Sequence, residues 1–151
     1  MPKKNSKSQF IQAIGKRKAA AALVRVFPLI GQSKISVNGI IMKRGDLYVN
    51  KKQLTEAFSL EIYRKIITKP LYLTGTEKNY AISVHVKGGG IKGQVDAISH
   101  GISRALVLID SQKYKQILKK NKLLKRDARV KERRKVGTGG KARRRKQSPK
   151  R

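Results

Sequence analysis

The chain has 151 residues and a formal net charge of +30, which fits one domain with a charged appendage. A charge that large makes nucleic acid a far better partner than a small-molecule substrate, and no apolar run approaches the roughly 20 residues that span a bilayer. The absence of cysteine excludes disulfides, thiolate metal sites and cysteine nucleophiles.

The distribution of charged and apolar residues predicts three parts. Residues 1–8 form a basic arm that lacks the apolar segment of a secretory signal. Residues 9–121 carry the apolar periodicity of a globular domain, long enough for a modest core. Residues 122–151 form an extended basic tail with almost nothing apolar to bury.

The first half of the globular part predicts strands joined by turns. Alternating apolar residues indicate a strand over Lys18–Leu29, and we expect Gln9–Ile14 to pair with it. Lys34–Val37 alternates again, and Asn38-Gly39 after it is the strongest short hairpin signal available. The first long strand should bury one row of side chains, Ala20, Ala22, Val24 and Val26.

A helix is predicted over Thr55–Thr68, where apolar residues recur at helical spacing, with Ser59 as its N-cap. Pro70 disfavours helical backbone at the residue before it, so we expect the helix to end there. Leu71–Leu73 then reads as a short strand, and Thr74-Gly75 as a turn.

The second half contains the clearest elements. Tyr80–Lys87 alternates strictly and predicts a half-buried strand. Lys92–Ile109 predicts a long helix, and Ser111–Lys120 a shorter one. The strand should bury Tyr80, Ile82, Val84 and Val86, and the long helix should bury Val95, Ile98, Ile102, Ala105, Leu106 and Ile109.

These elements together predict an α+β fold, with a single mostly antiparallel sheet and two main helices packed on one face. Gly101 interrupts the long helix, where glycine costs about 1 kcal/mol relative to alanine. Close packing of that helix on the sheet would explain this glycine, and we expect that structural role for it.

Gly88, Gly90 and Gly93 match the G-x-G-x-x-G pattern of dinucleotide-binding loops, and Asp110 follows about 20 residues on. We reject a cofactor site because the chain has no succession of βαβ units for a parallel sheet. The strand before the loop is also amphipathic, unlike a buried parallel strand.

Two interpretations of the glycine loop stay open. Glycines let backbone approach a ligand closely and a helix N-terminus attracts phosphate, so an RNA phosphate could dock between Lys87 and Lys92. Alternatively, the glycines only swing the chain from the sheet into the helix.

Three further cations, Lys16, Arg17 and Lys18, follow Gly15 between apolar stretches. We interpret them as a phosphate-contacting hairpin tip; the alternative is a solvated loop. The segment is not a P-loop, because the upstream glycine and the following Ser or Thr are both missing.

No catalytic or metal-binding constellation is visible. His85 and His100 have no carboxylate or third histidine at ligand spacing, and the eight acidic residues form no paired motif for acid–base chemistry. We therefore expect neither an enzyme nor a cofactor or metal, and we expect both histidines to be ordinary surface or packed residues.

The tail carries the strongest functional signal. The stretch 113–151 holds 19 of the 38 lysines and arginines against two acids, Asp127 and Glu132. Like charges repel, so the segment becomes ordered only against dense negative charge such as a phosphate backbone. Arginine dominates its far end, and the planar guanidinium suits phosphate better than an ammonium does.

Several segments resemble the small-subunit ribosomal protein nine family of the bacterial and organellar type. They fall in the family's order and cover nearly the whole chain from about Gly15. The matching segments are Val37-Asn38-Gly39, Pro70 to Thr76, Gly88-Gly89-Gly90, Gly93-Gln94, Gly101 to Leu106, Leu124 to Arg129, Glu132 to Lys135, Lys141 to Arg144 and Lys150-Arg151.

The resemblance implies a four-stranded sheet, two helices, a left-handed βαβ unit and a place in the head of the small ribosomal subunit. The body and tail would bind small-subunit rRNA beside neighbouring ribosomal proteins, and Lys150 and Arg151 would contact peptidyl-site tRNA. The expected rRNA-binding residues are Lys16, Arg17, Lys18, Lys87, Lys92, Arg126, Arg129, Arg133, Arg134, Lys135, Lys141, Arg143, Arg144, Arg145 and Lys146.

The type of family member places the ribosome in the bacterial cytoplasm or inside a plastid or mitochondrion. Two rival functions compete with this interpretation. The protein part of ribonuclease P is similarly small and basic, but its Arg-Asn-Arg helix motif is missing here. An architectural DNA-binding protein should favour duplex DNA, which nothing in this tail suggests.

Overall fold

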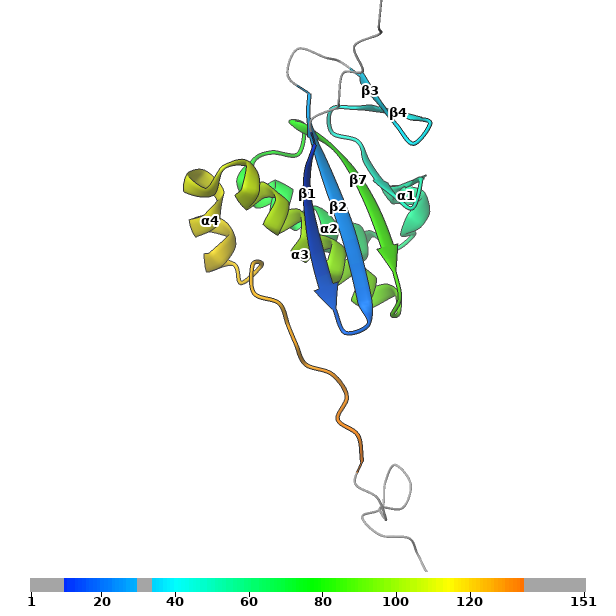
Figure 1. Cartoon of the computed structure of the whole chain (residues 1–151), viewed down its shortest axis with the longest axis vertical. Helices are drawn as coiled ribbons and strands as arrows, with labels where there is room; N and C mark the ends of the chain where they lie inside the picture. Colours follow the sequence, from blue (N-terminus) through cyan, green and yellow to red (C-terminus); the bar gives the residue numbers. More distant parts are fainter. Residues whose placement is uncertain (1–9, 30–33, 135–151) are drawn as a thin grey trace, which may run out of the picture.

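The structure, a computed structural model, describes residues 10–29 and 34–134, in which helices lie against one face of a five-stranded sheet (Figure 1). In spatial order the strands of this sheet are β1 (Ile11–Arg17), β2 (Ala20–Pro28), β7 (Tyr80–Lys87), β5 (Leu47–Val49) and β6 (Lys52–Gln53). The remaining elements are the β3–β4 hairpin (Lys34–Val37 and Ile40–Lys43) and the helices α1 (Leu54–Ala57), α2 (Glu61–Thr74), α3 (Ile91–Ile109) and α4 (Ser111–Lys120).

The prediction of a four-stranded sheet is wrong, because the sheet has five strands and is mixed. Neither β5 nor β6 is predicted from the sequence, since three and two residues are too few to show an alternation. β5 runs parallel to β7, whereas the other neighbouring strands are antiparallel. The chain connects β5 to β7 through α1 and α2, which makes a βαβ unit; its left hand stays a prediction.

The predicted end of the helix at Pro70 and the predicted strand over Leu71–Leu73 are also wrong. α2 continues through Pro70 to Thr74, and the side chains of Pro70 and Leu71 are buried in it. Burial of the proline ring in the core stabilises the helix by more than the loss of the hydrogen bond that proline, which has no N–H, cannot donate. The helix ends instead at Gly75, whose left-handed backbone (φ 63°) lets its N–H reach the carbonyls of Leu71 and Tyr72.

The start of this helix also differs from the prediction. The segment that begins near Thr55 is a separate single turn, α1, and α2 starts only at Glu61. Its N-cap is Leu60, which has no side-chain hydrogen bond to the helix, so Ser59 does not serve as the cap. Burial of Phe58 between the two helices separates them, and apolar periodicity alone did not reveal that break.

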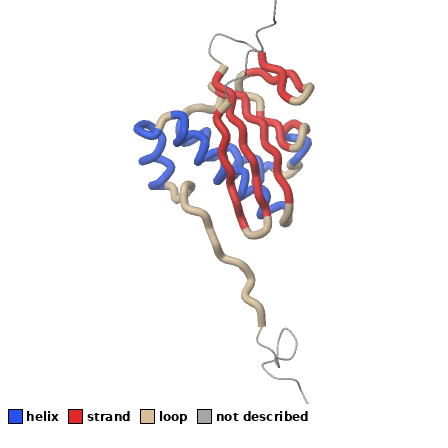
Figure 2. Tube along the Cα trace, in the orientation of Figure 1, coloured by secondary structure: helices blue, strands red, loops and turns tan. Residues whose placement is uncertain are grey.

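The main core confirms the predicted faces of the long elements. Ala20, Ala22, Val24 and Val26 of β2 and Ile82, Val84 and Val86 of β7 are buried in the core that these strands share with α3. Two residues at the ends of the predicted rows, Tyr80 and Ile109, are only partly buried against this core. The bounds of β7, α3 and α4 agree with the sequence-based prediction within one residue at either end. Figure 2 shows all the helices grouped behind or beside the sheet.

A second, smaller cluster covers the top of the opposite sheet face. The β3–β4 hairpin folds over the ends of β2 and β7 there and buries Phe27, Ala81 and Met42. Ala81 lies on the side of β7 that the alternation predicts to be exposed. Among the described residues, no helix or hairpin lies over the lower part of that face (Figure 1), where His85 is exposed.

Candidate nucleic-acid interface

The cations predicted at the hairpin tip lie at one end of the sheet. Lys16 and Arg17 are the last residues of β1, and Lys18 forms the turn into β2 with a left-handed backbone (φ 49°). Lys16 and Lys18 are exposed. Because Ala21 pairs with Lys87, the end of β7 and its exposed lysine lie beside the same turn.

The glycine loop packs directly on this turn. Gly88 has φ 73°, and a Cβ on it would lie 2.5 Å from the carbonyl oxygen of Ala19. A Cβ on Gly89 would lie 3.0 Å from that of Ala20. These contacts give both glycines a structural role, in agreement with the interpretation that the loop turns the chain from the sheet into the helix.

The loop also leaves the start of α3 accessible. Gly90 is the N-cap, has no side-chain hydrogen bond to the helix, and has open space around the position of a Cβ. The first N–H groups of a helix have no intrahelical partner and attract anions. Exposed Lys92 lies in that first turn. Phosphate docking at the start of α3 stays a prediction, beside the packing role of Gly88 and Gly89.

Arg17 holds the base of the tail against the body. Its Nε lies 3.6 Å from Oδ2 of Asp96 in α3, and its Nη2 lies 3.1 Å from Oδ2 of Asp127 in the tail. Its Nη1 donates to the carbonyl oxygens of Asp127 and Arg129, at 3.3 and 2.8 Å. We call this group of Arg17, Asp96 and Asp127 the tail latch.

Asp127 organises the tail locally as well. Its carboxylate accepts hydrogen bonds from the backbone N–H and the guanidinium of Arg129. These bonds, followed by the charges of Arg129 and Arg17, hold the pKa of Asp127 well below its usual range. One of the two acids of the basic tail is thus an internal counter-ion that shapes the chain.

His100 makes a second connection next to the latch. Its Nδ1 accepts from the backbone N–H of Lys16 at 3.4 Å, so Nε2 carries the proton and donates to the carbonyl oxygen of Leu124 at 3.2 Å. Burial lowers the pKa of His100, which favours this neutral form. Leu123 and Leu124 also pack against the main core, so the chain after α4 is anchored by apolar contacts too.

Beyond the latch, the described tail has neither helix nor strand and runs away from the body, as the orange segment of Figure 1 shows. Among the predicted rRNA-binding residues, Arg129, Arg133 and Arg134 lie in this stretch, Arg126 lies directly before Asp127, and all four are exposed. Outside the described residues lie Lys135, Lys141, Arg143, Arg144, Arg145, Lys146, Lys150 and Arg151.

Four basic residues near the tail base were not predicted from the sequence. Two cavities flank the tail base; Lys69, Lys122 and Lys125 line one, and Arg104 lines the other together with Lys16 and Arg126. Arg104 also donates to the carbonyl oxygen of Ile14. The sequence could have indicated Arg104, because the helical periodicity places it opposite the apolar stripe of the long helix. No such pattern indicates the three lysines, which only the tertiary structure brings to the same cavity.

Other site types receive no support from the part of the chain that the structure describes. Residues 10–29 and 34–134 contain no cluster of three potential metal ligands and no helix that is both long and apolar enough to cross a bilayer. The strand before the glycine loop is flanked by an antiparallel neighbour on one side, which differs from a dinucleotide-binding sheet.

A comparison with protein families agrees with the arrangement of a small α+β body and a cationic tail. The profile described as ribosomal protein S9/S16 matches residues 15–151, which includes the hairpin tip, the glycine loop, the latch and the whole tail. The chain therefore belongs to the ribosomal protein S9/S16 family, and it is a structural, RNA-binding protein of the small ribosomal subunit.

Proposed function

We propose that the body anchors this protein to rRNA in the head of the small subunit and that the tail extends from it to peptidyl-site tRNA. The rRNA contacts would come from the hairpin tip, from Lys87 and Lys92, and from the arginines and lysines of the tail up to Lys146. Lys150 and Arg151 at the tip would contact tRNA phosphates. Bacterial cytoplasm or an organelle interior is the proposed location.

The latch is the observation that carries this proposal. A cationic chain with no fixed starting direction would bind phosphate anywhere around the body, whereas Arg17 and Asp127 start the tail beside the cationic hairpin tip. The basic tail thereby begins next to the basic residues of the hairpin tip. Phosphate contacts of this kind position a protein on RNA without reading its sequence.

The tip is tested by reconstituting small subunits with a chain that lacks Lys150 and Arg151. We expect normal assembly but weaker binding of tRNA at the peptidyl site. The matched control replaces Lys119 and Lys120 with alanine, which removes the same charge from the exposed end of α4. Equal tRNA affinity in the truncated and control subunits would refute the role of the tip.

The placement in the subunit is tested by sedimentation. The protein should travel with small subunits, protect rRNA of the head from hydroxyl radicals, and leave the particle only in strong salt. Protection confined to another region of the rRNA would contradict the proposed place in the head.

A further inference from the structure

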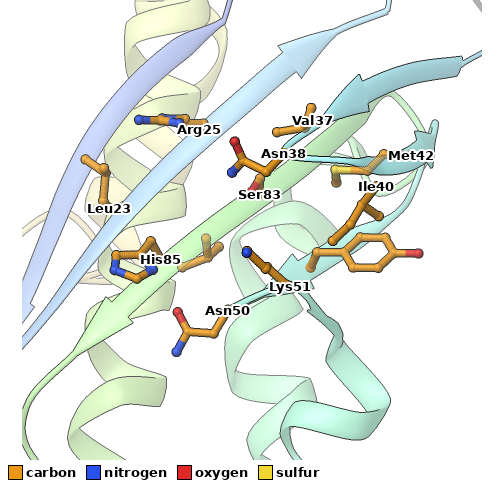
Figure 3. Close-up of a pocket in the computed structure, with 12 residues that line it drawn as sticks. Leu23, Arg25, Val37, Asn38, Ile40, Met42, Asn50, Lys51, Ser83 and His85 are labelled. Atoms are coloured by element: carbon orange, nitrogen blue, oxygen red, sulfur yellow. The ribbon is translucent and has the colours of Figure 1, made fainter.

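The open face of the sheet carries a pocket that the proposed interface does not use. This open-face pocket, a cavity of about 250 Å³, lies in the angle between the β3–β4 hairpin and strands β2, β5 and β7. Figure 3 shows Asn38 and Lys51 approaching Ser83 and His85 of β7 from the hairpin side. The pocket lies on the sheet face opposite α2 and α3.

Four of the polar residues that line the pocket are not used in internal hydrogen bonds. The side chains of Asn38, Lys51, Ser83 and His85 make no hydrogen bond or ion pair with any residue in 10–29 or 34–134. Apolar side chains, among them Met42 and half-buried Tyr48, complete the lining. The pocket therefore offers an apolar wall and a set of convergent polar groups, which is the usual composition of a ligand site.

The backbone at Lys51 gives an independent indication that its side chain is needed. The β3–β4 hairpin turns through Asn38-Gly39 with φ of 52° and 82°, the preferred pair for this turn. The β5–β6 hairpin turns through Asn50-Lys51 with φ of 47° and 69°. Lysine thus occupies the left-handed position that glycine occupies in the β3–β4 turn, and two other lysines of the described residues, Lys18 and Lys122, also have positive φ. Strained positions of this kind cluster at functional sites.

Asn50 has a structural role in the same turn, unlike Lys51. Its side chain pairs with both backbone groups of Val86, donating to the carbonyl at 3.1 Å and accepting from the N–H at 3.0 Å. It thereby continues the ladder at the edge of β7 and holds the turn against the sheet. This leaves the ammonium of Lys51 at the pocket as the unexplained feature of the turn.

The charge of the lining identifies the class of occupant. Lys51 and Arg25 are basic, and no acidic residue lines the pocket. Arg25 is partly engaged, by Gln12 and by the ring of Phe10. The cavity is smaller than the roughly 300–1,000 Å³ typical of drug-sized ligands. Its size suits one small group, and its basic lining suits a group that carries negative charge.

We propose that the open-face pocket holds a single unstacked nucleotide of the rRNA, an inference that rests on the proposed rRNA-binding function. The base lies against the apolar wall, Asn38 hydrogen-bonds its edge, and Lys51 pairs with its phosphate. Proteins read single-stranded RNA in this way, by splaying out a base and contacting its face and edge.

The test compares variants in binding to small-subunit rRNA and in chemical probing of the bound RNA. Asn38→Asp keeps a residue suited to the turn but puts a negative charge in the pocket. Lys51→Gly removes the cation while relaxing the turn. Lys52→Ala is the matched control, because Lys52 is exposed, adjacent, and outside the lining.

We expect Asn38→Asp and Lys51→Gly to weaken binding about tenfold, as removal of one base contact does, whereas Lys52→Ala binds almost like wild type. Urea unfolding should show Lys51→Gly to be at least as stable as wild type, which excludes a folding defect. One nucleotide protected in complexes of wild type and Lys52→Ala should become reactive with both pocket variants.

Equal affinity and identical protection in all four proteins would overturn the pocket while leaving the rRNA-binding function intact. Crosslinks from position 51 to a neighbouring protein, with no RNA crosslink, would also overturn it. Failure of the wild-type protein itself to bind the rRNA would overturn the proposed function first, so the two failures are distinguishable.

Discussion

Gly15 of β1 and Gly101 of α3 lie against each other with no room for a side chain on either. A Cβ on Gly15 would lie 1.9 Å from the carbonyl oxygen of Ala97 and 2.4 Å from the amide nitrogen of Gly101. This close approach of strand and helix places His100, the neighbour of Gly101, where it meets the backbone of Lys16. The same packing brings Asp96 within reach of Arg17, so the tail latch depends on it.

The glycine pair predicts that replacement of glycine by alanine has opposite effects on stability at two positions of α3. Gly101→Ala should destabilise the fold by about 1–3 kcal/mol through overpacking, because its Cβ would lie 2.6 Å from a methyl group of Val24. Gly93→Ala, in the same helix with only ordinary contacts at 3.7 Å, should stabilise it by up to about 1 kcal/mol. Gly15→Ala should be the worst, since backbone atoms cannot move aside. Urea unfolding measures all three, and equal effects at 93 and 101 would contradict the packing argument.

The latch predicts how the tail base responds to removal of one charge. Asp127→Asn removes the ion pair with Arg17 and weakens the bonds from Arg129, so the stretch after Leu124 should detach more often. Limited trypsin digestion should then cleave after Lys125 and Arg126 several-fold faster. Glu132→Gln, an exposed acid in the same tail, is the control with the same charge change. Cleavage at the wild-type rate in Asp127→Asn would show that the latch does not hold the tail.

His100 predicts a stability that declines in mild acid. Its pKa is lowered in the folded protein, so the unfolded chain takes up the proton first as the pH falls. The contribution to stability is complete above the ordinary pKa of 6.5 and decreases below it, until the pH passes the lowered pKa of the folded state. Urea unfolding between pH 7.5 and pH 5 should show this slope in wild type and in the control His85→Gln, but a smaller one in His100→Gln. Identical slopes in all three would exclude His100 as the source.

The tail predicts a salt dependence that truncation reduces. Removal of residues 135–151 deletes eight lysines and arginines. The slope of log affinity for rRNA against log salt should become shallower by about 0.7–0.9 for each phosphate that the shortened tail no longer neutralises. Replacement of Lys115, Lys119 and Lys120 in α4 by alanine is the control for general charge. A slope that the truncation leaves unchanged would place the RNA contacts elsewhere on the molecule.

Strong periodicity explains which elements could be predicted. Tyr80–Lys87 and the long helix each bury one row of side chains along almost their whole length, so the pattern in the sequence is the pattern of burial. The short strands at Leu47 and Lys52 bury too few residues to leave a pattern. The prediction at Pro70 failed because burial of its ring outweighs the local backbone preference.

Charge alone established that this protein needs a polyanionic partner, because the number of cations in a chain does not depend on how it folds. The arrangement of those cations was decided by the tertiary structure. Arg17 lies close to the carboxylates of Asp96 and Asp127, which are 79 and 110 positions away in the chain. No local sequence pattern predicts these ion pairs. The open-face pocket likewise exists only because two hairpins and two strands converge. Composition acts through the sum of its residues, whereas a site requires particular side chains to be brought together in space.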